Sequence, residues 1–339
     1  MSLDRAVMAN LRAEPPPIAP HPFGVQLTIH RLALGTSAAT LILIAAGGIV
    51  TSTGAGLAVP DWPATFGYNM FLFPWSRMVG GVLVEHSHRL LGSAVGVLVA
   101  GLTVVAWAGR CDRALRAFTA TALVLVCVQG LLGGLRVVLR QDSLAVVHGC
   151  LAQGFFALIA VLATVTGTAW RRVDSARAVP RLDRVAFLAA GTAIVLCGQV
   201  VLGALTTHAG WLTMHLVGGA LAVTGTGALV SVVFRRARTL APLRWRALAI
   251  GGLLVVQVGL GLGAALVRFT GVGVPGGELS AVGLPVTHRV VSALLLGLVV
   301  TLALHAWRLT AARFEADQTS GGHPVISQDS GLDRVTGTP

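Results

Sequence analysis

The chain has 339 residues, of which 55% are hydrophobic and only 11% are charged. A soluble domain usually carries about 25% charged residues, so this composition indicates that much of the apolar surface faces lipid. The net charge of +12 comes from arginine alone, because the sequence has no lysine. The arginines form short clusters between apolar runs, which is typical of membrane loops and argues against nucleic-acid binding.

Eight apolar stretches are long enough to cross a bilayer as helices, which takes about 20 residues each. We predict spans at about 32–50, 80–108, 117–139, 143–169, 185–207, 211–234, 245–268 and 283–307. The sequence therefore predicts an all-α integral membrane protein with eight transmembrane helices.

The arginines fall unevenly on the two sides of this predicted bundle. Nineteen of the 25 lie on the side of the two termini, and cytoplasmic loops are the ones enriched in basic residues. We expect cytoplasmic termini, with polar tails at 1–31 and 309–339 and a cytoplasmic linker at 171–184. Asp4 and Glu14 argue against a mitochondrial transit peptide, so we expect a bacterial plasma membrane.

The first four spans resemble the last four. The matching segments are Gly48-Ile49-Val50-Thr51 with Gly203-Ala204-Leu205-Thr206, Gln129-x-x-x-Gly133 with Gln257-x-x-x-Gly261, and Leu144 to His148 with Leu284 to His288. Because each repeat has four spans, both face the same way across the membrane. The fold predicted is two parallel-repeat four-helix bundles, 32–170 and 185–308.

Four histidines lie at one depth, near the outer ends of the even-numbered spans: His88, His148, His215 and His288. Facing helices can present two imidazoles to one iron, so we predict two pairs, one in each bundle. A single histidine in an apolar span is often only a hydrogen-bonded core residue, but four in repeat register favour a ligand role. Catalytic zinc usually takes three clustered ligands, so two pairs favour haem.

Glu85 is the only acid well inside an apolar span. It precedes His88 by three residues and Arg89 by four, so the three share one helix face. Two interpretations stay open, a reactive carboxylate or a structural ion pair with Arg89. The second bundle has Leu212 in this place, which suggests one reactive haem site and one electron-transfer site. Arg89 and Arg289 each follow a predicted ligand, and either could pair with a haem propionate or extend to the interface.

The remaining features each have two interpretations. Residues 51–79, rich in proline and aromatic residues, form either a lid over a site or an interfacial aromatic belt. His208, predicted in the loop between spans five and six, is either close to the site or merely interfacial. Glycines in the odd-numbered spans leave room for a flat macrocycle or permit close helix contact, and they are Gly130, Gly133, Gly134, Gly203, Gly259, Gly261 and Gly263.

Several of these motifs resemble the haem A synthase family. The motif Glu85-x-x-His88-Arg89 is similar to the family signature, as are Gly48 to Trp62 and Gln129 to Arg136. The resemblance extends over about residues 30–308. Many bacterial members have a cysteine pair in the first outer loop, whereas residues 51–79 of this chain have no cysteine.

The resemblance implies an enzyme that oxidises the C8 methyl group of haem O to a formyl group, giving haem A for terminal oxidases. It implies that His88 and His148 flank haem O, the substrate, beside Glu85 as the catalytic carboxylate. It also implies that His215 and His288 ligate a haem b cofactor. Expected partners are the bilayer, a haem O synthase and an unidentified electron acceptor.

Two rival functions remain at this stage. The first is a di-haem b electron-transfer cytochrome without substrate chemistry, which would not need Glu85. The second is a repeat-built transporter, which the sequence argues against because its ionisable groups lie near one face rather than at the midplane.

Overall fold

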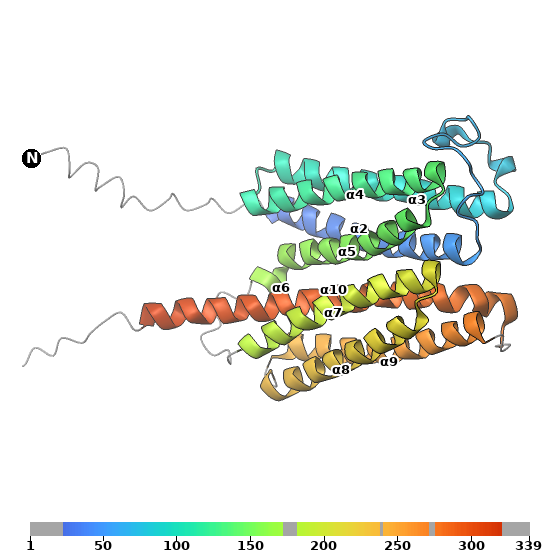
Figure 1. Cartoon of the computed structure of the whole chain (residues 1–339). Helices are drawn as coiled ribbons and strands as arrows, with labels where there is room; N and C mark the ends of the chain where they lie inside the picture. Colours follow the sequence, from blue (N-terminus) through green and yellow to red (C-terminus); the bar gives the residue numbers. More distant parts are fainter. Residues whose placement is uncertain (1–22, 172–181, 238–239, 271–274, 321–339) are drawn as a thin grey trace, which may run out of the picture.

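The computed structural model describes residues 23–171, 182–237, 240–270 and 275–320. Its regular structure in these residues is entirely helical (Figure 1). The long helices are α2 (Phe23–Ser52), α3 (Gly80–Ala108), α4 (Arg113–Leu139), α5 (Asp142–Thr166), α7 (Asp183–Ala209), α8 (Leu212–Arg236), α9 (Ala241–Phe269) and α10 (Gly277–Ser320). Short helices are η1 (Met70–Leu72), η2 (Trp75–Arg77) and α6 (Thr168–Arg171).

All eight predicted spans are confirmed as helices long and apolar enough to cross a membrane. The main differences lie at the outermost ends, where α2 begins at Phe23 rather than near residue 32 and α10 runs on to Ser320. His30 shows why the first helix starts early, because its Nδ1 lies 3.0 Å from the Ala163 carbonyl oxygen and is thereby satisfied. A polar residue with a partner does not end a helix, although it does end an apolar run in the sequence.

The helices form two rings of four. In the first unit α2, α3, α4 and α5 each pack against the next, and α5 closes on α2. In the second unit α7, α8, α9 and α10 do the same, and α10 closes on α7. Figure 1 shows the two units one above the other, with their helices nearly parallel. The arrangement is consistent with the predicted parallel repeat.

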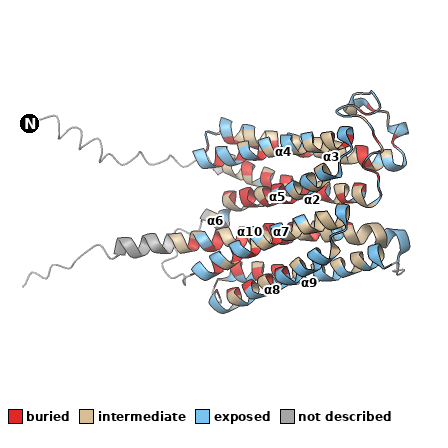
Figure 2. Ribbon diagram, in the orientation of Figure 1, coloured by how far each residue is buried: buried red, intermediate tan, exposed pale blue. Residues whose placement is uncertain are grey.

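The units meet through α2, α5, α7 and α10. Helix α10 packs against α2 and α5, and α5 also packs against α7. If α2 is exchanged with α7 and α5 with α10, the contact of α2 with α10 becomes that of α7 with α5, and the contact of α5 with α10 is unchanged. This is the pattern expected for a pseudo-twofold axis along the bundle. Buried residues follow the faces between helices, whereas the outer faces are exposed and suit lipid contact (Figure 2).

The two ends of the bundle differ. The long connection from Thr53 to Val79 lies at one end, which we call the loop end. At the opposite end, the tail end, the described chain begins with α2 and finishes with α10 (Figure 1). At the loop end of the second unit, α7 is joined to α8 by Gly210 and Trp211 alone, and Gly210 adopts the left-handed conformation with φ of 75°.

Candidate functional site

The structure brings the four predicted histidines together as two facing pairs. His88 from α3 and His148 from α5 have ring centroids 6.5 Å apart, with the ring planes at 87° to each other. His215 from α8 and His288 from α10 have centroids 6.3 Å apart, with the planes at 80°. In each pair the two helices stand on opposite sides of the four-helix unit, so the imidazoles face one another across its interior.

This spacing fits one metal ion between each pair of imidazoles. A metal–imidazole bond is about 2 Å long, and the centre of an imidazole lies roughly 1 Å from its ligating nitrogen. Two rings on opposite sides of one metal ion therefore have centroids about 6 Å apart. The observed 6.5 and 6.3 Å agree with this value, so the residues present fit an iron with two axial imidazoles.

Each of the four rings rests on a glycine of the preceding helix. A Cβ atom at the glycine would come within 2.9–3.3 Å of the Cε1 atom of the histidine, closer than ordinary contact. The pairs are Gly47 with His88, Gly133 with His148, Gly203 with His215 and Gly261 with His288. These glycines therefore make room for the ligating ring itself, a use that neither sequence interpretation of the glycines foresaw.

The contacts also correct the register of the repeat. The sequence comparison paired Gly48 with Gly203, but it is Gly47 that contacts a histidine as Gly203 does. The hydroxyl of Thr51 donates to the Gly47 carbonyl, and Thr207 donates to Gly203 in the same way. The first unit is thus aligned one residue earlier than the sequence match indicated.

Three of the four glycines are preceded by a glutamine one turn earlier, and this glutamine bonds to the facing histidine. Gln199 donates to the carbonyl oxygen of His215 at 2.8 Å and contacts its Nδ1 at 3.0 Å. The Nδ1 of His288 lies 3.1 Å from the Gln257 carbonyl oxygen, and the side-chain amide lies 3.3 Å from Nε2. Because a carbonyl oxygen can only accept, Nδ1 of His288 carries the proton of the neutral ring, and the lone pair is on Nε2, the nitrogen that a metal would bind in place of the Gln257 amide.

Glu85 lies at the loop end of the first unit, where both of its carboxylate oxygens are bonded. Arg89 donates to Oε1 at 2.7 Å and the Val59 backbone N–H donates to Oε2 at 2.9 Å. The side chain of Glu85 is 4% exposed and that of Arg89 is 10% exposed. The ion pair proposed as one interpretation of Glu85 is therefore present.

Arg89 also binds the long loop directly. Its Nη1 donates to the carbonyl oxygens of Asp61 and Ala64, and its Nη2 donates to that of Val59. Both amino groups are thus fully used by the loop and by Glu85. A role for Arg89 in binding haem stays a prediction, and only its Nε–H is left for that purpose.

The loop packs down onto the first unit at several other points. The ring of Trp62 lies directly over Gly134, and Arg136 donates to the Gly56 carbonyl oxygen at 3.2 Å. His86 is buried and bonds to Thr65 rather than to another histidine. These contacts support the lid interpretation, because buried bonds hold residues 56–65 against the bundle.

The loop is also braced within itself. The carboxylate of Asp61 accepts hydrogen bonds from the backbone N–H groups of Phe66 and Gly67. Burial raises the pKa of Asp61, but these hydrogen bonds and the nearby Arg89 outweigh burial, so the pKa lies below its usual value. Asp61 therefore stays ionised and holds the turn that follows it.

Among the cavities formed by the described residues, two lie at opposite ends of the molecule. One of about 180 Å³ opens at the loop end between the units, and it is lined by Thr51, Arg136, Thr207, His208 and Arg268 among others. His208 belongs to the last turn of α7, not to the loop where the sequence placed it. The cavity lies toward the loop end from the histidine pairs, and sequence reasoning missed it.

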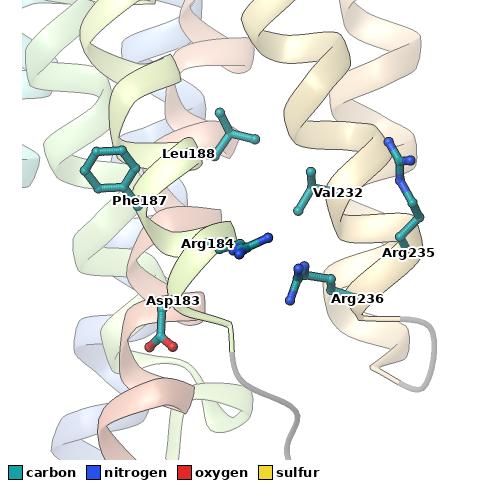
Figure 3. Close-up of a pocket in the computed structure, with 7 residues that line it drawn as sticks. All are labelled: Asp183, Arg184, Phe187, Leu188, Val232, Arg235 and Arg236. Carbon is teal, nitrogen blue, oxygen red and sulfur yellow. The ribbon is translucent and has the colours of Figure 1, made fainter.

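The other cavity is at the tail end, between α7 and α8. Figure 3 shows Arg184 of α7 and Arg236 of α8 pointing toward each other across it, with Phe187, Leu188 and Val232 above them. None of the paired histidines lines this cavity, so it is separate from the candidate site.

Fold and site together define a multi-pass helical membrane protein in which each of two units holds a facing pair of histidines. Residues 30–214 match the cytochrome oxidase assembly protein family (COX15-CtaA), and the chain belongs to this family. The match covers the first unit from His30 onward and ends at Met214, one residue before the first histidine of the second pair. The link between the second unit and the first is their shared pattern of histidine, glycine and glutamine contacts.

Individual relatives align with part of the chain. A haem A synthase of Alkalihalophilus pseudofirmus is 33% identical over 128 residues, which are 37% of this chain and 42% of the relative. One of Shouchella clausii is 34% identical over 132 residues, which are 38% and 42% respectively. One of Bacillus cereus is 28% identical over 187 residues, covering 54% of this chain and 58% of the relative. The aligned regions thus cover less than two thirds of each relative.

Proposed function

We propose that the chain is a haem A synthase, which oxidises the C8 methyl group of haem O to a formyl group. The observation that carries this proposal is the pair of facing imidazoles inside each unit, spaced for one iron. Family membership and relatives named haem A synthase support it.

The two units have different roles in this proposal. His88 and His148 flank haem O in the first unit, and His215 and His288 hold haem b in the second. When bound, haem b would supply one-electron transfer, and His215 and His288 are the residues that would hold it. The protein contributes the depth and orientation of each imidazole, which the glycine and glutamine contacts fix.

Conversion of a methyl to a formyl group removes four electrons and four protons when the oxygen atom enters as water. Glu85 is the proposed catalytic carboxylate, because it lies one helical turn from His88 on the same face. A carboxylate there can accept a proton, orient water or stabilise positive charge that develops on the carbon. The four electrons require an acceptor, which we propose is a separate redox partner.

The alternative is a di-haem b cytochrome that transfers electrons without altering haem. The ion pair of Glu85 with Arg89 favours it, since that pair gives the acid a structural use. The two functions differ in their product, because only the synthase makes haem A.

Haem extraction tests the proposal. Membranes that express the chain together with a haem O supply should contain haem A, detected by chromatography and mass of the extracted haem. The same membranes without the chain are the control. Bound haem b with no haem A would favour the cytochrome instead.

We also propose that the loop end faces the outside of a bacterial plasma membrane, with both termini in the cytoplasm. The support is the excess of arginine on the tail side. The enzyme that supplies haem O is the proposed partner, because its product would be the substrate of this chain.

Cysteine labelling tests the orientation. Ser76 at the loop end and Ala241 at the tail end are both exposed. In a chain without its four native cysteines, an impermeant reagent added outside intact cells should label Ser76→Cys and not Ala241→Cys. The reverse pattern would show that the orientation is inverted.

A further inference from the structure

The cavity at the loop end concentrates positive charge at the seam between the units. Arg136 comes from α4 of the first unit, whereas Arg268 and His208 come from α9 and α7 of the second. Arg289 of α10 is also near, since it acts electrostatically on both His208 and Arg268. Two arginines from two helices therefore line one small space, and Arg289 from a third helix lies near it.

None of these arginines is bonded to an acid in the described part of the chain. Arg136 and Arg268 each donate to a backbone carbonyl oxygen, of Gly56 and Thr207. Arg289 donates to the Gly48 carbonyl oxygen and to the Ser52 hydroxyl. Each contact satisfies hydrogen bonding without neutralising charge.

Asp142 is the one described acid that acts on His208, and it is exposed. One exposed carboxylate does not balance three guanidinium groups at the end of a membrane bundle, where unpaired charge is costly. The seam thus has the charge of an anion site.

The cavity lies next to both histidine pairs. Thr51 and Thr207, which line it, each lie one helical turn, about 5 Å, toward the loop end from the glycine that supports a histidine. Arg136 acts electrostatically on His88 and His148, and Arg289 acts on His288. A ligand held by either pair could therefore extend a charged group into the same space.

We propose that this cavity binds the carboxylates of haem, and that it is shared by the haems of both units. The inference rests on the proposed haem binding. A haem carries two carboxylates on flexible side chains at one edge, and arginine suits carboxylates because it can donate two parallel hydrogen bonds. The shared cavity joins the substrate unit to the cofactor unit through charge.

A comparison of two porphyrins tests the proposal. Purified chain stripped of haem is titrated with iron protoporphyrin IX and with its dimethyl ester, which lacks both carboxylates, and Kd is measured from the absorption spectrum. The unaltered chain should bind the free acid at least about tenfold more tightly, as expected for a charge-assisted hydrogen bond. Arg268→Gln should weaken binding of the free acid by about tenfold and leave binding of the ester unchanged.

Two further variants make the result decisive. The first variant is Arg136→Gln in a chain whose first pair is removed by His88→Ala and His148→Ala. It should still weaken binding of the free acid, because the cavity is shared across the seam. Arg77→Gln is the matched control, since Arg77 lies at the loop end but bonds to Tyr68 outside the cavity.

The outcomes separate the proposals. If the unaltered chain binds neither porphyrin, the proposed function fails. If it binds both equally, or if Arg268→Gln weakens both equally, haem binding stands and the carboxylate site is overturned. A phospholipid headgroup as the occupant would leave the preference for the free acid intact in Arg268→Gln and would lower the phosphorus that copurifies, which also overturns the proposal.

Discussion

In the first unit, a loop of 27 residues is tied to α3 by Glu85 and Arg89, whereas in the second unit Gly210 and Trp211 connect α7 directly to α8. Despite these different connections, the histidine pairs of the two units have nearly the same spacing. The centroid distances of the two pairs differ by only 0.2 Å, 6.5 against 6.3 Å. The facing histidine pair is thus present in both units, whereas the buried carboxylate and the loop that covers it are present only in the first.

A difference in function between the two units would arise at the position of Glu85. Leu212 stands at the start of α8 where Glu85 stands in α3, so the second unit has neither the carboxylate nor its arginine partner. Two imidazoles alone favour a haem that exchanges electrons. A buried carboxylate one turn away adds a group that can handle protons, which fits a unit that alters its haem.

Removing one histidine of a pair should have the largest effect. His215→Ala leaves a single axial ligand in the second unit, so the low-spin haem b spectrum should be lost while the first unit keeps its binding. His88→Ala should do the reverse. Haem content and the reduced absorption spectrum of the purified protein measure both effects.

His305→Ala is the control for this prediction. His305 is also buried, but its ring packs on Trp170 at the tail end rather than on another histidine. If His215→Ala and His288→Ala both kept the original spectrum, the pairing across the second unit would be wrong.

Glu85→Gln should have the next largest effect, on the product more than on folding. The amide keeps the shape and can still accept the Val59 bond, but it cannot act as a base. We expect the variant to insert and to keep haem in its second unit, while haem O or a partly oxidised haem accumulates in place of haem A. Extracted haems, compared at equal protein level, give the measurement.

Arg89→Gln distinguishes chemistry from a structural ion pair. Breaking a buried pair costs about 3 kcal/mol or more whichever partner is removed, so both variants should lower stability. Only Glu85→Gln removes the carboxylate, and it should therefore lose more haem A than Arg89→Gln does. Equal losses, or near-normal haem A from Glu85→Gln, would assign Glu85 to holding the loop.

The sequence predicted the helices and the histidine pairs because both depend on local patterns. Apolar length defines a span, and His88, His148, His215 and His288 repeat at fixed places within spans. It could not fix the register, because two adjacent glycines, Gly47 and Gly48, fit the pattern equally well. The glutamine at 199 was missed, although Gln199-x-x-x-Gly203 repeats the motif that marks the other helices.

The loop contacts were beyond sequence reasoning for a different reason. Arg89 reaches backbone carbonyl oxygens 25 to 30 residues away, and every residue has such an oxygen, so no pattern of side chains signals the contact. The cavity at the seam likewise depends on how the loop ends of α2, α4, α7 and α9 are placed around one space. Its arginines looked like ordinary loop residues when taken one by one.

The smallest predicted effect concerns the glycines under the four rings, and it compares the units most finely. Alanine at these positions should push the ring of the facing histidine by a few tenths of an ångström, because its Cβ would lie 2.9 Å from His288 at Gly261, 3.0 Å from His88 at Gly47, 3.2 Å from His215 at Gly203 and 3.3 Å from His148 at Gly133. Overpacking of this kind costs about 1 kcal/mol or more, or about fivefold in the Kd of the haem in that unit.

The effects on haem and on the helix should have opposite signs. Alanine favours a helix interior over glycine by about 1 kcal/mol, so the haem-free variants should unfold at the same temperature as the unaltered chain or at a higher one. Gly191→Ala in α7 is the matched control, because its Cβ would meet nothing within 4 Å, and it should leave haem affinity unchanged. Within each unit the closer contact should cost more, so Gly261→Ala should weaken haem binding more than Gly203→Ala, and Gly47→Ala more than Gly133→Ala. Titration of each variant with haem gives the order, and an inverted order in both units would show that the glycines serve helix packing rather than the ligating rings.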